Sequence, residues 1–600
     1  MTDKKVRIGG ASGFWGDSCV GAPQLVCHGN IDYLVFDYLA ELTMSILASA
    51  RLKKPELGYA TDFVTVTMKS LLKEIAERGI RVVSNAGGMN PHGCAQAIAE
   101  LAAAQGVPLR IAVVEGDDVM PLLPRLREAD VRDMQRGLPL PARVVSANAY
   151  LGALPIKQAL DSGAQVVVTG RCVDSAVTLG VLMHEFRWAS DAYDQLAQGC
   201  LAGHIIECGA QGTGGLHTDW DQVPDWDNIG YPVIECSADG SFTVSKPPDT
   251  GGLVNRATVG EQVLYEIGDP ASYLLPDVIC DFTQVRLTQV APDVVALSGA
   301  RGRAPTDTYK VSATYVDGYR CNAQLTIVGV DAVAKAERTA QAILARTRRL
   351  FAENGWGDYS RTHVDILGAE SIFGPHAATR HTREAIMRLA VMHPEKAALE
   401  LFAREVAPAG TSWSPGTTGS GNGRASPSPS IRQYGFLLDK RMLTPAVVMD
   451  GVRTEVPIPQ GCAAAPVRAA QPAASTAEPA DPCAQRETVE VPLIRLAWGR
   501  SGDKGDTSNI GLIARKPEYL PLLRKQVSSE RVAAWLAHLV KGEVTRYELP
   551  GFDALNFVCE SALDGGGMAS LRNDPLGKGM AQIVLTMPVR VPKTWATDLG

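Results

Sequence analysis

The sequence predicts an α/β protein with a large parallel-sheet region at the N-terminus, a second α+β lobe and a small α+β domain at the C-terminus. Six short aliphatic runs in the first 185 residues each lead directly into small and polar residues, and helical stretches separate most of them. A stretch rich in alanine and proline, at residues 461–488, then separates the small domain from the rest.

The six runs are the predicted strands of the large region. Val82-Val83 and the three valines at 166–168 lack polar alternation, which indicates parallel strands covered on both faces. Residues 67–78 and 93–105 are predicted helices between them. Because ligands bind outside the carboxyl ends of parallel strands, we expect the polar clusters to form the site. The junctions span residues 6–17, 31–41, 81–91, 110–118, 142–150 and 164–176.

The rest of the chain has a mixed pattern. An Ala-rich helix is predicted at 333–351, among strands of the second lobe. The last region alternates strands with a helix at 529–539 and ends in a predicted strand at 581–591, which is typical of a compact ferredoxin-like domain. The predicted divisions are a parallel α/β domain at 1–235, a second α+β lobe of the same large domain at 236–460, a linker at 461–488 and the small domain at 489–600.

Composition excludes several classes of protein. No apolar run reaches the ~18–20 residues that span a bilayer, and the N-terminus lacks a signal-peptide core, so we expect a cytoplasmic protein with no membrane contact. The net charge of −7 offers no basic face for nucleic acid. Twelve cysteines without a Cys-x-x-Cys pair are expected to be reduced and mostly buried.

A glycine motif follows the first predicted strand. Gly10, Gly13 and Gly16 resemble the loop with which dehydrogenases approach a pyrophosphate, and Asp37 lies near the place of a ribose-binding acid. The helix that should follow is interrupted by glycine and proline, and no tyrosine has a lysine four positions on. An NAD(P)-dependent oxidoreductase is therefore the second hypothesis.

The third junction holds two carboxamides, Asn85 and Asn90, around Gly87 and Gly88. Pro91 suits the first turn of a helix, so Asn90 alone is explained as a helix N-cap. The backbone N–H groups of such a loop also suit a carboxylate or an enolate oxygen. The loop at 85–90 is therefore predicted to form an oxyanion pocket.

Three carboxylates, Glu115, Asp117 and Asp118, stand at the end of one predicted strand. They repel one another unless a cation or a shared proton compensates, and helix capping explains only one of them. One interpretation is a divalent metal, Mg²⁺ or Mn²⁺, bound by all three. The other is an acid/base role for Asp117 or Asp118.

Arg171 and Asp174 follow the run of valines at 166–168. Such a pair is usually a surface ion pair of small effect. At the end of a buried strand, Arg171 is instead predicted to clamp a substrate carboxylate or phosphate, with Asp174 as its orienting partner or a general base. Cys172 has no histidine close in sequence, which disfavours a role as nucleophile.

Two further polar segments are candidates for binding. His204 and Glu207 lie three residues apart, so a helix places them on one face, either as a buried hydrogen-bonded histidine or as an acid/base or metal pair. In the small domain, Asp503 and Lys504 belong to a segment at 500–509 with more charge than a turn needs. We predict a binding or interface loop that closes over the main site.

Assembled, these motifs resemble the acyclic terpene utilisation family, called AtuA. The resemblance is carried by RIGGASGFWGD, DYLAELTM, NAGGMNP, VEGDD, TGRCVDSA, AGHIIECGAQ, KPPDTGGLV and YEIGDP. The tail, WGRSGDKGDTSNIG, resembles the small ferredoxin-like domain of the family. The similarity covers nearly the whole chain apart from the linker.

The resemblance implies a place in the catabolism of branched acyclic terpenoids through coenzyme A thioesters, with coenzyme A as part of the substrate. It implies a lyase or hydratase acting on a 3-hydroxy-3-branched glutaryl-CoA or a neighbouring unsaturated acyl-CoA. Such reactions need a base, an acid and an oxyanion pocket, for which the strand-end residues above are the first choice. Asp17 and Glu41 are second-line candidates.

Two other functions stay open beside the acyl-CoA enzyme. One is the NAD(P)-dependent oxidoreductase, and the other is a non-catalytic binding or scaffold subunit for enzymes of coenzyme A. Charged groups at buried strand ends are costly for a scaffold, which favours an enzyme. A homo-oligomer with a small-molecule acyl-CoA as partner is expected, since symmetric oligomers are common.

Overall fold

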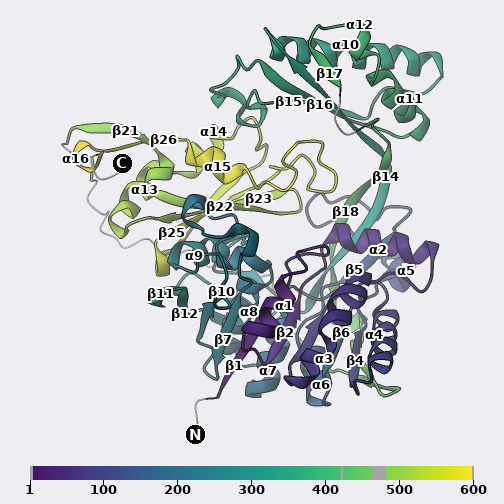
Figure 1. Ribbon diagram of the computed structural model, residues 1–600, viewed down its shortest axis with the longest axis vertical. Coiled ribbons are helices and arrows are strands. Elements are labelled where there is room, and N and C mark those ends of the chain that lie inside the picture. Colours follow the sequence, from purple (N-terminus) through teal and green to yellow (C-terminus); the bar gives the residue numbers. More distant parts are fainter. Residues whose placement is uncertain (1–3, 420–422, 463–481, 485, 597–600) are drawn as a thin grey trace.

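The computed structural model describes residues 4–419, 423–462, 482–484 and 486–596 of the protein. Figure 1 shows an α/β body at the bottom, a lobe at the top that is reached by long strands, and the C-terminal domain beside both. The body contains an eleven-stranded sheet in the order β11-β12-β8-β7-β1-β2-β3-β6-β4-β19-β20.

Five of the six predicted strands form the parallel centre of this sheet. Along β2 (Tyr33–Phe36), Tyr33 and Val35 face one hydrophobic cluster, while Leu34 and Phe36 face another. Helices therefore cover both faces, as the unbroken apolar runs predict. The other parallel strands are β1 (Lys5–Gly10), β3 (Arg81–Ser84), β4 (Ile111–Glu115) and β6 (Val166–Thr169).

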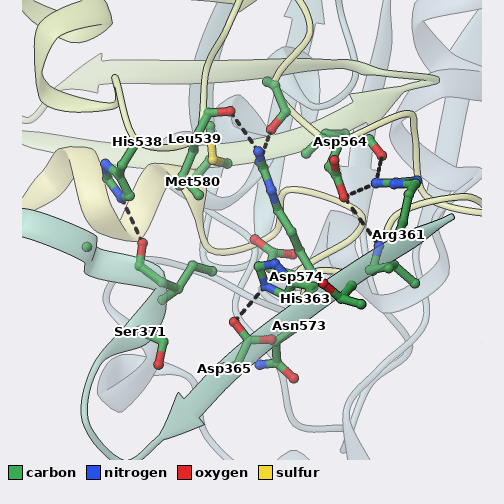
Figure 2. A pocket seen from close by; sticks show the side chains of 17 residues that line it. Arg361, His363, Asp365, Ser371, His538, Leu539, Asp564, Asn573, Asp574 and Met580 are labelled. Atoms are coloured by element: carbon green, nitrogen blue, oxygen red, sulfur yellow. Dashed lines mark hydrogen bonds and ion pairs between the residues drawn. The ribbon is translucent and has the colours of Figure 1, made fainter. Parts of the chain in front are cut away.

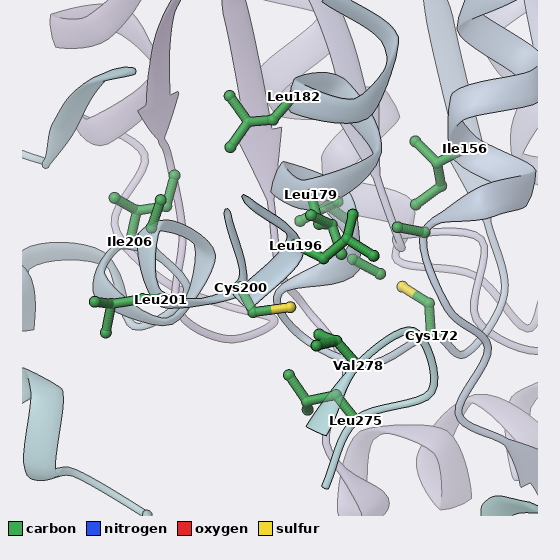
Figure 3. Packing of buried hydrophobic residues seen from close by; sticks show 14 of the residues in the cluster. Ile156, Cys172, Leu179, Leu182, Leu196, Cys200, Leu201, Ile206, Leu275 and Val278 are labelled. Carbon is green, nitrogen blue, oxygen red and sulfur yellow. The ribbon is translucent and has the colours of Figure 1, made fainter. Parts of the chain in front are cut away.

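Two groups of helices cover the faces. The first face carries α1 (Gly21–His28), α2 (Glu41–Lys53), α3 (Lys69–Glu77) and α4 (Pro91–Gln105). The second face carries α6 (Leu154–Asp161), α7 (Ala176–Phe186) and α8 (Tyr193–Ile206). Figure 3 shows the interior of the second group, where Cys172 and Cys200 lie among leucine, isoleucine and valine side chains.

The strand predicted at 142–150 does not join the parallel sheet. It forms β5 (Ser146–Ala149), which pairs antiparallel with β14 (Thr308–Val328). Two of its four side chains are polar and need partners: Ser146 Oγ lies 2.7 Å from Thr314 Oγ1, and Asn148 donates to Asp117. A strand with such side chains does not suit the centre of a sheet that is apolar on both faces.

The predicted division at residue 235 is also wrong, because the main sheet continues across it. β7 (Val233–Ser237) pairs with β1, and β8 (Phe242–Ser245), β12 (Val294–Ser298) and β11 (Arg286–Ala291) extend that edge. At the other edge, β19 (Ala446–Met449) pairs with β4, and β20 (Val452–Glu455) follows.

The upper lobe is an insertion between two long strands that start and end in the body. β14 leaves the body as a strand of 21 residues and returns as β18 (Ser428–Asp439). Between them lie β15 (Arg361–Leu367), β16 (Glu384–His393) and β17 (Thr417–Gly419), covered by α10 (Ala332–Glu353) and α11 (Lys396–Val406). The helix predicted at 333–351 is thus confirmed, within α10.

The C-terminal domain has a four-stranded antiparallel sheet in the order β22-β23-β25-β24. The strand predicted at 581–591 is partly wrong: α15 (Met580–Leu585) precedes β26 (Pro588–Pro592). A short apolar run cannot be assigned to a strand or a buried helix by periodicity alone, and five of the six side chains of α15 are buried. Most of the predicted linker, 463–481 and 485, lies outside the described residues.

The upper lobe rests on the C-terminal domain across a cleft of about 470 Å³. Figure 2 shows Arg361 of β15 directed at Asp564 of the C-terminal domain, with which it forms an ion pair. On the other side, His538 contacts the backbone carbonyl of Ile372 through Nε2 at 2.9 Å. These contacts fix the domain against the lobe.

Candidate functional site

A cavity of about 640 Å³ lies where the body, the long strands and the C-terminal domain meet. Asp174 reaches it from the loop after β6, Lys310 from β14 and Lys504 from the C-terminal domain. Glu266 reaches it from the segment that follows α9 (Arg256–Leu264). Four charged residues from separate parts of the chain therefore share one cavity, which we call the strand-end cavity.

Arg171 orients Asp174 and does not itself line the strand-end cavity. Only 4% of Arg171 is exposed, and its guanidinium group donates to Asp174 Oδ1 at 3.1 Å and to the backbone carbonyl of Leu39 at 2.6 Å. Its Cζ atom lies 4.1 Å from the centre of the Tyr150 ring. The structure thus gives Arg171 the role of holding Asp174, in place of the predicted clamp on substrate.

Glu41 is ionised behind the cavity wall. The Tyr150 hydroxyl donates to Glu41 Oε1 at 2.5 Å, and Gln433 Nε2 donates to the same oxygen at 3.0 Å. Burial opposes its charge, but the cations Lys310 and Arg171 prevail and lower the pKa of Glu41 to about 2. Glu41 is thus a fixed negative charge that faces Tyr150.

The predicted binding loop at 500–509 is a β-hairpin. β22 (Ala497–Lys504) and β23 (Thr507–Ala514) pair up to Lys504 and Thr507, so Gly505 and Asp506 form the turn. Lys504 and Gly505 line the strand-end cavity, as expected for a segment that closes over the site.

Charges of opposite sign surround the hairpin tip. Lys504 Nζ lies 3.4 Å from Glu266 Oε2, and Lys578 Nζ lies 3.9 Å from Glu266 Oε1. Burial opposes the charge of Glu266, but the two lysines lower its pKa. Burial and the charge of Glu266 raise the pKa of Asp503, the next residue on the hairpin, to about 7. Asp503 lies beside the cavity and not in its lining.

His204 and Glu207 form a buried pair at the end of α8. His204 Nδ1 lies 2.8 Å from Glu207 Oε1, while His204 Nε2 is buried and has no hydrogen-bond partner within the described ranges. Burial raises the pKa of Glu207, and the negative charge of Glu207 outweighs burial to raise the pKa of His204. Tyr273, which lines the cavity, lies between them and the site, with its ring centre 6.2 Å from that of His204.

The predicted oxyanion loop has structural partners instead. Asn90 Oδ1 accepts from the Gly93 N–H at 3.0 Å and caps α4. A Cβ atom on Gly87 would lie 2.5 Å from the Thr169 carbonyl oxygen, so this glycine permits close packing. Gly88, with φ of 50°, packs against Leu47 in the same way. None of these residues lines the strand-end cavity.

Asn85 forms a hydrogen bond with the buried carboxyl group of Asp37. Asn85 Nδ2 donates to Asp37 Oδ1 at 2.5 Å, and Asn85 Oδ1 accepts from the Tyr38 N–H at 2.7 Å. Burial, followed by the charge of Asp174, raises the pKa of Asp37 well above its usual value. Asn85 therefore positions a carboxyl group rather than an oxyanion.

The three carboxylates after β4 diverge. Glu115 pairs with His92 and Arg453, each at 2.7 Å. Asp118 is exposed and accepts from the Met120 N–H at 2.9 Å. In the part of the chain that the structure describes, no three side chains of metal-ligating type come together. The metal site predicted from Glu115, Asp117 and Asp118 is therefore wrong.

Asp117 joins three elements. Its Oδ2 atom accepts from Asn148 Nδ2 on β5 and from the Arg171 N–H after β6, each at 2.8 Å. Burial outweighs these hydrogen bonds and raises the pKa of Asp117 to about 6. Asp117 ties β4 to β5 and β6 and is directed away from the cavity lining.

Protein atoms occupy the space next to the glycine loop after β1. A Cβ atom on Gly10 would lie 2.6 Å from the Ile206 carbonyl oxygen, and one on Gly13 would lie 2.6 Å from the backbone of Cys208. Asp17 accepts from the Gly13 N–H and from the Tyr231 hydroxyl, each at 2.8 Å. The loop packs against the end of α8, so it offers no space for a pyrophosphate.

Cys172 is part of the core. It belongs to the same buried cluster as Leu179 and Ile156 (Figure 3), and burial raises the pKa of its thiol to about 12. A protonated, buried thiol is not a nucleophile at neutral pH. The cysteines of the described residues are free, and seven of them are buried.

Three residues of the site are not predicted from the sequence: Lys310, Glu266 and Tyr150. Tyr150 and Glu266 lie in segments quoted above, the end of the run at 142–150 and YEIGDP, but neither was singled out. Lys310 stands in a long strand without a motif around it. Only the pairing of β14 with β5 and β18 brings it to the site.

Comparison with known proteins identifies two regions. Residues 6–449 match the model of the acyclic terpene utilisation family protein AtuA, and residues 491–590 match that of the AtuA ferredoxin-like domain. No curated protein and no solved structure matches the chain. Among the described helices, none has both the length and the apolar character to cross a bilayer. Since the first match alone covers most of its length, the chain belongs to the acyclic terpene utilisation family AtuA.

Proposed function

We propose that the protein is an enzyme that cleaves or hydrates a branched acyl-CoA thioester, of the 3-hydroxy-3-branched glutaryl-CoA type, in the strand-end cavity. The observation that carries this proposal is that charged and apolar side chains line the same cavity. A cavity of about 640 Å³ has the size usual for small-molecule sites and suits the acyl portion, with the rest of coenzyme A outside.

The apolar side chains of the lining suit a branched hydrocarbon chain. Met134, Leu274 and Leu437 line the cavity and remain about half exposed, at 53%, 53% and 54%. Exposed apolar side chains that line a cavity indicate a surface for an apolar ligand. These side chains accord with the acyclic terpenes from which the family takes its name.

The charged side chains of the lining suit the polar part of the same substrate. Lys504 is placed to pair with a free carboxylate, and Asp174, held by Arg171, is placed to move a proton. In the cleavage, Asp174 takes the proton of the 3-hydroxyl, the bond between C2 and C3 breaks, and its electron pair passes to the thioester enolate. In a hydration, the same carboxylate activates water.

Calorimetric binding of 3-hydroxy-3-methylglutaryl-CoA, followed by product analysis, tests the proposal. Asp174→Asn should still bind and should lose at least ~100-fold in turnover, the usual effect of removing a general base. Asp118→Asn, an exposed carboxylate outside the cavity, is the matched control and should behave as wild type. Equal turnover of wild type and Asp174→Asn would exclude this base, and failure to bind any acyl-CoA would favour a scaffold subunit.

NADH fluorescence should not change when the protein is added, because protein atoms occupy the space next to the glycine loop.

A further inference from the structure

Lys310 is a cation without an ion pair in the strand-end cavity. Within the described ranges, its Nζ atom forms no hydrogen bond or salt bridge, and its recorded contact is the Tyr150 ring, with Nζ 5.0 Å from the ring centre. By contrast, Lys504, the other lysine of the lining, pairs with Glu266. An unpaired lysine in a cavity of this kind is unusual, because a charged ammonium group needs compensation.

The surroundings of Lys310 lower the pKa of its ammonium group. Burial is the largest cause, and the positive charges of Lys504 and Arg171 add to it. The negative charges of Glu41 and Asp174 act in the opposite direction but do not outweigh burial. Desolvation and a neighbouring cation are the two known ways to make a lysine nucleophilic.

The strand geometry directs Lys310 toward the space that a ligand would occupy. Lys310 and Leu437 are directly paired across β14 and β18, and both line the cavity. The backbone N–H of Tyr150 donates to the Lys310 carbonyl at 3.0 Å, which fixes the strand at this point. Lys310 therefore lines the cavity beside an apolar side chain.

We propose that Lys310 is a nucleophile that forms an imine with the ketone group of a branched β-keto acid. The Lys310 amine adds to the carbonyl carbon, and one N–H proton moves to the oxygen to give a carbinolamine. A second proton, supplied by a cavity carboxyl such as Asp174, leaves with the hydroxyl group as water. The product is a protonated imine, and the acid that gave the proton is left as a carboxylate.

The choice of ketone rests on the proposed function. Cleavage of a 3-hydroxy-3-branched glutaryl-CoA between C2 and C3 leaves a β-keto acid, whose ketone carbon was C3 of the substrate. The carboxylate of this acid suits Lys504, and its branch suits the apolar side chains of the lining. The amine is placed for any ketone of this shape, whichever reaction produces it.

Reductive trapping tests the assignment. The full-length protein is incubated with acetoacetate and sodium cyanoborohydride, and the adduct is located by peptide mass spectrometry. We expect one stoichiometric adduct, on Lys310, formed faster than on any other lysine, since a lowered pKa raises the fraction of free amine. Lys310→Arg, which keeps the charge, should abolish the adduct at an unchanged melting temperature.

Lys504→Arg is the matched control, because it alters the other lysine of the cavity lining. It should slow trapping by weakening binding of the carboxylate and should leave the adduct on Lys310. Labelling of Lys504 or of surface lysines at comparable rates would overturn the assignment, as would equal trapping in Lys310→Arg. Binding of the acyl-CoA, measured separately, is independent of the trapping, so loss of trapping with retained acyl-CoA binding refutes the role of Lys310 alone.

Discussion

Arg171 shows how one buried side chain organises the site. Its cation is compensated by Asp174, by the Leu39 carbonyl and by the face of the Tyr150 ring. A buried charge with several partners is expensive to disturb, because removal of one partner leaves the others uncompensated. The residue therefore controls the direction of Asp174 without reaching the cavity itself.

The raised pKa of Asp117 should make the stability of the protein depend on pH. Its folded-state pKa of about 6 exceeds the ordinary value of 3.8, so the folded protein binds more protons than the unfolded chain between these values. Stability should therefore fall as pH rises from about 4 to 6. Asp117→Asn, whose amide oxygen can still accept both hydrogen bonds, should remove the contribution of Asp117 to this slope and stabilise the protein by up to about 3 kcal/mol above pH 6.

Urea unfolding at several pH values measures this effect. Asp118→Asn is the control, since this side chain is exposed and is expected to leave the slope unchanged. A slope as steep in Asp117→Asn as in the wild type would show that Asp117 does not contribute to it.

Lys504 should affect binding more than chemistry. If its ammonium group pairs with the substrate carboxylate, Lys504→Gln should raise KM about 10- to 100-fold, the effect of losing a charged hydrogen bond, with a small change in kcat. Steady-state kinetics with 3-hydroxy-3-methylglutaryl-CoA measure both constants. Lys541→Gln, an exposed lysine of the same domain, should change neither. A loss confined to kcat would instead place Lys504 in the chemical step.

At the scale of elements, the hairpin of β22 and β23 is the part of the site that the C-terminal domain supplies. Its turn residue Gly505 has a φ of 64°, a conformation that a side chain disfavours, and a Cβ atom there would lie 3.1 Å from the Gln135 amide. The position of Lys504 therefore depends on a turn that is strained by any residue but glycine.

Gly505→Ala and Gly451→Ala make a matched pair. Both glycines have positive φ, but Gly451 lies in the turn between β19 and β20 with open space around it. Each substitution should cost about 1 kcal/mol of stability from backbone strain. Only Gly505→Ala should also raise KM, by displacing Lys504, as measured by kinetics beside thermal unfolding. Equal kinetics of the two variants would show that the hairpin tip tolerates displacement.

The sequence predicted the parallel strands correctly because an apolar run covered on both faces has a simple pattern. It failed for β5 and α15, whose assignment depends on distant partners: β14 for the first and the packed core of its domain for the second. The residues of the site likewise fall into those that the sequence predicts and those that depend on distant partners. Asp174 and Lys504 lie in polar clusters and were found, whereas Lys310 is recognisable only after β14 has paired.

For the whole molecule, the strand-end cavity is complete only when the C-terminal domain is docked on the body. Arg515 and Asp219 hold this interface through a bidentate ion pair, with nitrogen–oxygen distances of 2.5 and 2.6 Å, and Trp498 Nε1 donates to Asp219 at 2.7 Å. Asn509 bridges the same surfaces, since it donates to the Leu264 carbonyl and accepts from the Glu266 N–H. These contacts therefore hold Glu266 and Lys504 in position opposite each other across the interface.

Asp219→Asn should therefore weaken both the docking and the site. Burial opposes the charge of Asp219, but hydrogen bonds from Arg515 and Trp498 lower its pKa, so its contribution to stability is present above the ordinary pKa of 3.8 and is lost as pH falls below it. We expect a loss of ~1–3 kcal/mol at pH 7, from charged hydrogen bonds, that disappears toward pH 3, together with a raised KM. Asp439→Asn removes a comparable pairing with Arg441 on an exposed surface and is the control. If the two variants match in unfolding and in KM, the docking contacts do not hold the cavity together; if Asp219→Asn alone changes both, the interface is part of the site.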